Sequence, residues 1–137
     1  MPITDPVADL FCSIKNAIAA DKKYVVVNSS NMRKQILRIL EEEKYVEKFS
    51  ILEPSEEEKR KFEQIKIQIR YLENGESFIR GLKKVSKPGK RVYVNVSSIP
   101  VVLNHIGTAL ISTNKGILTD AAARKYNVGG EYIGKIW

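Results

Sequence analysis

Ser112-Thr113-Asn114-Lys115-Gly116 is a polar stretch between two apolar runs, residues 108–111 and 117–118. It holds two hydroxyls, an amide, a cation and a glycine, so it offers hydrogen-bond donors and acceptors without a bulky apolar side chain. Gly116 permits a positive φ or the close approach of another backbone. These features predict a turn between two strands, and taken alone they describe an ordinary β-turn.

The chemistry of this turn suits recognition better than catalysis. Unpaired nucleotides present several hydrogen-bonding groups close together, and hydroxyl and amide side chains match base edges and sugar hydroxyls. A nucleophilic hydroxyl would need a nearby base. The only histidine, His105, stands in an apolar context. We therefore expect no covalent catalysis here.

Length and composition limit the class of protein. The chain has 137 residues, of which 43% are hydrophobic, enough for one ordinary domain or two small ones with a real core. No apolar run is long enough to span a membrane, and the polar start has no signal-peptide pattern, so we expect a soluble cytoplasmic protein. With one cysteine, Cys12, and one histidine, an internal disulfide and a structural zinc site of the Cys/His kind are excluded. We expect no metal and no cofactor.

Positive charge is concentrated in the second part of the chain. Residues 1–75 carry 13 Lys and Arg against 13 Asp and Glu, whereas residues 76–137 carry 10 against 3. The whole net charge of +7 therefore lies beyond residue 75. Clustered cations favour a polyanionic partner, because they release condensed counterions when they meet phosphates. The alternative is a surface kept soluble by its net charge.

The first part, residues 1–73, predicts an α-β-α-β-β module. Asp5-Pro6 is typical of a helix start, and an apolar stripe follows at helical spacing. The second helix follows the cap residues 28–30, with Met32, Ile36, Ile39 and Leu40 expected on its buried side. Strands are expected at residues 24–27, 45–52 and 65–71. The charged residues 53–61 predict a mobile surface connection rather than a binding loop.

The second part, residues 76–137, predicts mostly antiparallel β structure with one short helix. The change in composition at Asn74-Gly75 marks the expected boundary between the two modules. The overall class is therefore α/β in the α+β sense. We expect a hairpin of strands at 77–85 and 91–96 around Pro88-Gly89, a short irregular or helical piece ending near residue 103, a strand at 108–111, a helix at 121–125 and a final strand at 131–137. That final strand would bring Gly130 and Glu131 near the Ser-Thr turn.

The expected hairpin is strongly basic. No acid lies between residues 77 and 96, and Tyr93 stands among six cations: Arg80, Lys83, Lys84, Lys87, Lys90 and Arg91. Cations that follow a nucleic-acid backbone beside an aromatic ring are common in RNA-binding proteins. An edge hairpin protected from aggregation by lysines is the alternative. We expect the RNA-binding role, with Lys84, Lys87, Lys90 and Arg91 positioned on phosphates and Ser112, Thr113 and Asn114 supplying discrimination. Lys115 is a further RNA-binding candidate in the turn.

Several of these motifs occur in one order along the chain. They are Asp5-Pro6-Val7-Ala8-Asp9-Leu10, Val85-Ser86-Lys87-Pro88-Gly89-Lys90-Arg91-Val92-Tyr93, Ser112-Thr113-Asn114-Lys115-Gly116-Ile117-Leu118-Thr119-Asp120, Ala123-Arg124 and Gly129-Gly130-Glu131. Together they resemble the bacterial ribosomal protein S8 family over nearly the whole chain.

The resemblance implies a two-module α/β protein and a function. A member of this family is a primary rRNA-binding protein that binds the central domain of small-subunit rRNA and helps nucleate its assembly. It contacts neighbouring small-subunit proteins, and in many bacteria it represses its own operon by binding an mRNA site that mimics the rRNA. The implied RNA-binding positions are Ser112, Thr113 and Gly116 in the turn, Lys87, Arg91 and Tyr93 in the basic segment, and Thr4, Asp5, Pro6, Lys15 and Asn16 near the start.

Parts of the sequence are compatible with two other functional classes. An enzyme acting on RNA would need Asp9, Asp120 and Glu131 as its carboxylates, but no base or metal cluster accompanies them. A protein-interaction adaptor could use the first module, which holds 13 of the 16 Asp and Glu residues, and this role is compatible with RNA binding.

Overall fold

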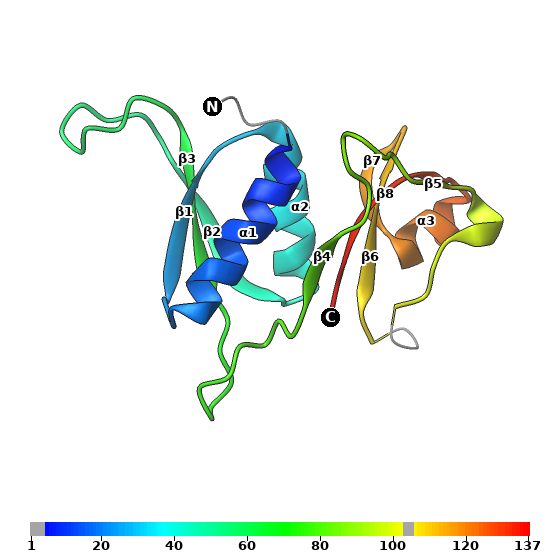
Figure 1. Ribbon diagram of the computed structural model, residues 1–137. Helices are drawn as coiled ribbons and strands as arrows, with labels where there is room; N and C mark the ends of the chain where they lie inside the picture. The colour runs from blue at the N-terminus through cyan, green and yellow to red at the C-terminus, as the bar shows by residue number, and fades with distance from the viewer. Residues whose placement is uncertain (1–4, 103–105) are drawn as a thin grey trace. The chain divides into compact units, whose positions relative to one another are not determined.

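The chain folds into two compact units. The computed structural model describes residues 5–102 and 106–137. One unit is Cys12–Phe78, and the other combines the residues up to Phe11 with Ile79–Trp137. The division falls after Phe78 and adds the first residues to the C-terminal part, whereas the sequence places the boundary at residues 73–76. Helices and antiparallel sheets occur together, which confirms the expected α+β class (Figure 1). None of the helices in the described ranges is long and apolar enough to cross a membrane.

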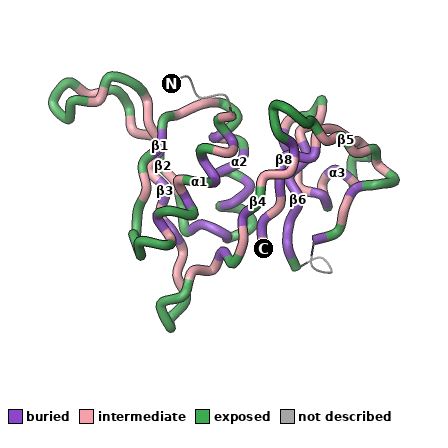
Figure 2. The backbone as a smooth tube through the Cα atoms, viewed as in Figure 1, coloured by how far each residue is buried: buried purple, intermediate pink, exposed green. Residues whose placement is uncertain are grey.

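The Cys12–Phe78 unit is built on a three-stranded antiparallel sheet of order β1-β3-β2. The element order along the chain is the expected one: α1 (Pro6–Ala19), β1 (Tyr24–Asn28), α2 (Asn31–Glu42), β2 (Val46–Leu52) and β3 (Gln64–Ile69). Alternate residues of β3, namely Ile65, Ile67 and Ile69, are buried (Figure 2). The period-two pattern of the sequence therefore places one face of the sheet in the core.

The cap of α2 agrees with the prediction, but its buried stripe differs in one residue. The Ser30 side chain accepts a hydrogen bond from the Arg33 backbone N at 3.1 Å, as expected of an N-cap. Met32 was predicted on the buried side and is exposed, whereas Leu37 is buried. The reason is that Arg33 itself is buried, with Nη1 donating to the Asn28 carbonyl at 2.7 Å. The stripe thus starts one residue later than the apolar pattern indicates.

The connection between β2 and β3 has local structure of its own. Ser55 and Arg60 exchange backbone hydrogen bonds at 2.9 and 2.8 Å. This connection extends beyond the ends of β2 and β3 (Figure 1). Its mobility stays a prediction.

The second unit contains a five-stranded antiparallel sheet. Its path is β4-β8-β6-β7, and β5 pairs with β8 as well. The elements are β4 (Leu82–Lys84), β5 (Tyr93–Val94), the short 3-10 helix η1 (Val96–Ser98), β6 (Thr108–Thr113), β7 (Gly116–Thr119), α3 (Asp120–Tyr126) and β8 (Gly130–Ile136). The expected caps and final strand are present: Thr119 caps α3, and the Trp137 backbone N donates to the Gly81 carbonyl at 3.0 Å. The C-terminal strand is therefore tied into the sheet.

The hairpin predicted from strands at 77–85 and 91–96 is wrong in its pairing. β4 and β5 are short, and each pairs with β8 rather than with the other. Pro88-Gly89 is nevertheless the centre of a turn, because the Lys90 backbone N donates to the Lys87 carbonyl at 2.9 Å. The central strand β8 satisfies the backbone groups of both short strands in succession. Of the predicted short piece ending near residue 103, residues 101–102 are irregular, as one of the two alternatives expected, whereas Leu103 and His105 lie outside the described residues.

Removing a core side chain of β3 tests the burial pattern. Ile67 is fully buried, so Ile67→Ala should lower the free energy of unfolding by about 2–5 kcal/mol. The neighbouring Gln68 lies on the other side of the strand, and Gln68→Ala should change it by less than about 0.5 kcal/mol. Urea unfolding of both full-length variants measures the difference. Equal losses would show that the assigned inward face is incorrect.

Candidate nucleic-acid interface

The Ser-Thr turn joins β6 to β7. Thr113 pairs with Gly116 across the turn, and Gly116 has a φ of 98°, which is the left-handed region that glycine tolerates. The Thr113 hydroxyl donates to the Gly116 carbonyl at 2.8 Å and accepts from the Lys115 backbone N at 3.0 Å. Thr113 therefore closes the turn with its own side chain.

The other side chains of the turn are available to a partner. Asn114 and Lys115 are exposed, and Ser112 is half-buried. Within the described residues, the structure records no hydrogen bond for the Ser112 hydroxyl or the Asn114 amide. The turn thus presents a hydroxyl, an amide and an ammonium group on a backbone that Thr113 and Gly116 fix.

The neighbouring strands place Tyr93 and Glu131 beside this turn. Glu131 of β8 is opposite Ser112 of β6 on one side and opposite Tyr93 of β5 on the other. Side chains directly opposite one another across strands point to the same face. Tyr93 is 69% exposed. The expectation that Gly130 and Glu131 lie near the Ser-Thr turn is confirmed.

Gly130 allows the close contact between β8 and β6. A Cβ atom at this position would stand 1.9 Å from the Ser112 carbonyl oxygen, far inside van der Waals contact. Only a residue without a side chain fits there unless the strands move apart.

Glu131 also holds the basic segment. Its Oε2 accepts a hydrogen bond from the Ser86 hydroxyl at 2.5 Å and one from Arg91 Nη1 at 3.0 Å. The Ser86 hydroxyl in turn accepts from the Val92 backbone N at 3.1 Å. Ser86 is fully buried, so it fixes both sides of the Lys87–Lys90 turn to β8. Sequence reasoning missed this residue, although a serine directly before the Lys-Pro-Gly turn was the available signal.

The four cations of the basic segment differ in their surroundings. Lys87 and Lys90 are exposed, and within the described residues neither forms an ion pair. The Arg91 side chain is 47% exposed although it pairs with Glu131. The Lys84 side chain is only 11% exposed, and its Nζ lies 3.4 Å from Asp5 Oδ2 and donates to the Ser86 carbonyl. Lys84 thus holds the start of α1 to β4, and its charge is already compensated.

The candidate residues near the N-terminus are distributed over both units. Asp5 caps α1 by accepting from the Ala8 backbone N at 3.1 Å, and Pro6 is exposed. Lys15 and Asn16 are exposed in the Cys12–Phe78 unit, where the Asn16 amide donates to Cys12 Sγ at 3.6 Å. Thr4 lies outside the described residues. The structure therefore brings together the turn, the basic segment, Tyr93, Gly130 and Glu131, while Lys15 and Asn16 belong to the other unit.

A second aromatic residue lies at the turn. Lys115 Nζ is 5.6 Å from the centroid of the Tyr126 ring, and Tyr126 is more than half exposed. Sequence reasoning did not select Tyr126, because only the fold brings the end of α3 to the β6-β7 turn. An exposed ring beside a cation that forms no ion pair within the described residues is suited to stacking on a base.

The carboxylates considered for catalysis have structural partners. Asp120 accepts from the Ala109 backbone N at 3.3 Å and from Arg124 Nη1 at 3.1 Å. Burial raises the pKa of the Tyr132 hydroxyl above its usual value, and the negative charge of Asp120 raises it further. The described ranges contain no cluster of histidine, cysteine and carboxylate groups that could hold a metal ion.

Known proteins match this chain over its full length. The family model described as Ribosomal protein S8 matches residues 5–137. The small ribosomal subunit protein uS8 of Clostridioides difficile (strain 630) is 47% identical over 137 residues, with all of both chains covered. The uS8 proteins of Acholeplasma laidlawii (strain PG-8A), 42% identical over the whole of both chains, and of Persephonella marina (strain DSM 14350 / EX-H1), 47% identical over 98% of this chain and 99% of its own, are also similar.

Substituting Gly130 tests the contact between β8 and the turn. Gly130→Ala places a methyl group against the Ser112 carbonyl, so it should cost about 1–3 kcal/mol of stability and shift the backbone NMR signals of the turn. The control is Gly89→Ala, whose added Cβ would have no neighbour within 4 Å and should change stability by less than about 0.5 kcal/mol. Undisturbed turn signals in Gly130→Ala would contradict the close approach of the two strands.

Proposed function

We propose that this chain, which belongs to the ribosomal protein S8 family and is a structural constituent of the small ribosomal subunit, binds small-subunit rRNA directly. The family is one of structural ribosomal proteins and not of enzymes. This agrees with the structural roles of Asp120 and Glu131, which the enzyme hypothesis would need for catalysis.

One observation carries the proposal. Glu131 binds the basic segment through Ser86 and Arg91, and the same residue lies opposite Ser112 in the sheet. A pair of lysines without ion-pair partners in the described part of the chain, Lys87 and Lys90, is thereby held beside a turn rich in hydrogen-bonding groups. RNA recognition requires this combination, because phosphate contacts set position while contacts to bases set specificity.

The two kinds of contact are divided among named side chains. Lys87, Lys90 and Arg91 attract phosphates, and Tyr93 offers a ring for stacking. Ser112 and Asn114 supply donors and acceptors to bases and sugar hydroxyls. Thr113 acts chiefly by holding the turn in shape, since its hydroxyl is already bonded within the turn.

The likeness to the family supports more specific partners. We expect the central domain of the rRNA as the binding region, assembly of that domain as the process, and neighbouring small-subunit proteins as further contacts. An operon mRNA that imitates the rRNA site would use the same residues. In that case every substitution in the turn would weaken the binding of the rRNA and of the mRNA to the same extent.

Substitutions in the turn and in the basic segment should separate specificity from charge. Ser112→Ala should cost about 1–3 kcal/mol in binding to a transcript of the central domain and little in binding to a plain duplex. Lys87→Ala should weaken the binding of both RNAs by the same factor. It should also lower the magnitude of the slope of log K against log salt by about 0.7–0.9, the contribution of one phosphate. Lys61→Ala, which removes an exposed charge from the β2-β3 connection, is the control. Filter binding at several salt concentrations measures all three.

The proposed division would be wrong if Ser112→Ala and Lys87→Ala lowered the affinity for every RNA equally. Direct rRNA binding itself would be wrong if the unsubstituted chain bound the transcript no better than the plain duplex.

A further inference from the structure

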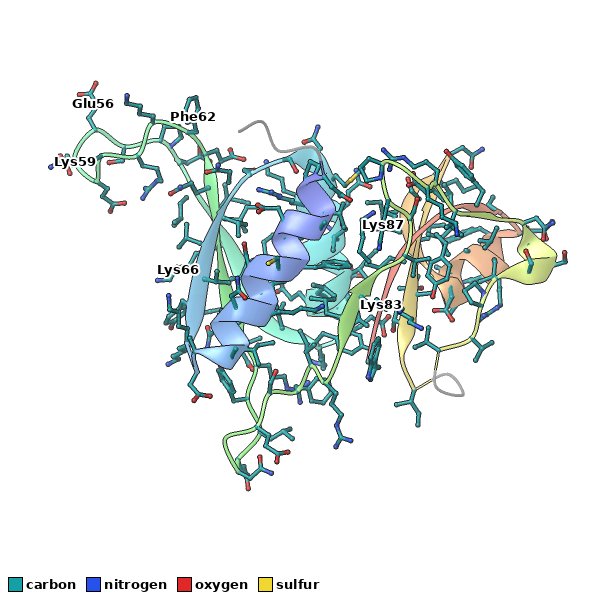
Figure 3. The ribbon with its side chains drawn as sticks, in the orientation of Figure 1. Glu56, Lys59, Phe62, Lys66, Lys83 and Lys87 are labelled. Atoms are coloured by element: carbon teal, nitrogen blue, oxygen red, sulfur yellow. The ribbon has the colours of Figure 1, made fainter. Side chains whose placement is uncertain are left out.

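The sheet of the Cys12–Phe78 unit has one face with exposed side chains. Buried isoleucines of β3 point to the other face, and Gln64, Lys66 and Gln68 alternate with them. In β1, Tyr24 and Val26 are 40% and 47% exposed and pair with Gln68 and Lys66. Figure 3 shows Lys66 pointing away from α2. This surface, which we call the outer face, plays no part in the interface described above.

The outer face lacks negative charge. The strand register assigns nine residues to it: Tyr24, Val26, Asn28, Lys48, Ser50, Leu52, Gln64, Lys66 and Gln68. None is a carboxylate, although basic and acidic residues nearly balance between residues 12 and 78. The acids of this unit are segregated from the face, where two lysines stand among amides and hydroxyls. The exposed carboxylate of β2, Glu47, lies at the bulge between Val46 and Lys48, so an anionic partner would meet no repelling group among these nine residues.

A shallow hollow lies at the centre of the outer face. Its volume is about 180 Å³, and its lining residues are Tyr24, Lys48, Ser50, Lys66 and Gln68. Each of the five carries a hydrogen-bond donor. The hollow therefore offers two ammonium groups, two hydroxyls and an amide to one small group of acceptor atoms.

The aromatic ring holds one of the cations without neutralising it. Lys66 Nζ lies 4.3 Å from the centroid of the Tyr24 ring, and Lys23 Nζ lies 5.6 Å from it. A cation–π contact fixes an ammonium group in place and leaves its charge available. Within the described residues, neither Lys48 nor Lys66 forms an ion pair.

We propose that the hollow on the outer face binds the phosphodiester backbone of RNA and gives the chain a second RNA contact, distinct from the Ser-Thr turn. This proposal rests on the proposed function, because it assigns another segment of the same RNA to the other unit. A nucleic acid would use both kinds of group present: the cations for phosphates, and the surrounding amides for sugar hydroxyls and base edges. An acidic peptide would meet the same groups, and the crosslinking experiment below distinguishes it from RNA.

Removing the two charges of the hollow tests the proposal. The double variant Lys48→Gln/Lys66→Gln of the full-length chain should bind the central-domain transcript about tenfold more weakly, with a salt slope lower by about 1.4–1.8 for two lost phosphate contacts. The matched control Lys59→Gln/Lys61→Gln removes the same charge from the exposed β2-β3 connection and should bind within about twofold of the unsubstituted chain. Thermal unfolding of both variants confirms that they are folded.

The ring of Tyr24 provides a second test. Tyr24→Phe keeps the aromatic ring that the Lys66 ammonium group contacts, so it should keep most of the affinity for the transcript. Tyr24→Leu removes the ring and should lower that affinity about threefold. Equal binding by the two variants would show that the ring does not position the cation for RNA.

The outcomes separate this proposal from the function on which it rests. If the Lys48→Gln/Lys66→Gln variant binds like its control while Lys87→Ala binds more weakly, the second contact is overturned and direct rRNA binding stands. If the unsubstituted chain does not bind the transcript, both the second RNA contact and direct rRNA binding are overturned. A photo-crosslinking residue at Gln68 should attach to RNA in assembled small subunits. Attachment to a protein instead would assign the outer face to a protein partner and overturn the proposal.

Discussion

The position of Glu131 on β8 is the constraint on which the candidate interface depends. Its carboxylate accepts from the buried Ser86 hydroxyl and from Arg91, and its backbone lies between β5 and β6. Two segments far apart in the sequence, the Lys87–Lys90 turn and the β6-β7 turn, are thereby fixed to one strand. The pairing of Glu131 with Ser112 needs a glycine at the neighbouring position 130, since any side chain there would collide with the Ser112 carbonyl. The segment that we propose for phosphates and the turn that we propose for bases are thus linked through a single acidic residue in a basic unit.

Local patterns in the sequence predicted the elements well because they are local physical effects. Ser30 and Thr119 cap their helices as their types indicate, and the alternation in β3 separates its buried and exposed faces. Pairing was less predictable. The residues around Pro88-Gly89 look like a hairpin, but β4 and β5 each pair with β8, and sequence alone does not say which distant strand takes these hydrogen bonds.

The same limit applies to the candidate site. Residue types indicated the Ser-Thr turn and the lysines. They did not show that the Thr113 hydroxyl forms its hydrogen bond within the turn, or that Asp5 compensates the positive charge of Lys84. Ser86 and Tyr126 were missed because their importance depends on contacts to Glu131 and Lys115 made by other segments. The sequence shows that positive charge is concentrated in the second part of the chain. It does not show which of the cations form ion pairs in the fold.

The central claim is that the two turns held by Glu131 contact one RNA together. Hydrogen–deuterium exchange of the full-length chain, followed as the central-domain transcript is added, tests it most directly. The account predicts that amides in residues 86–91 and 112–116 are slowed in parallel, with the same midpoint in RNA concentration. Slowing of only one segment, or of the two at clearly different midpoints, would contradict it.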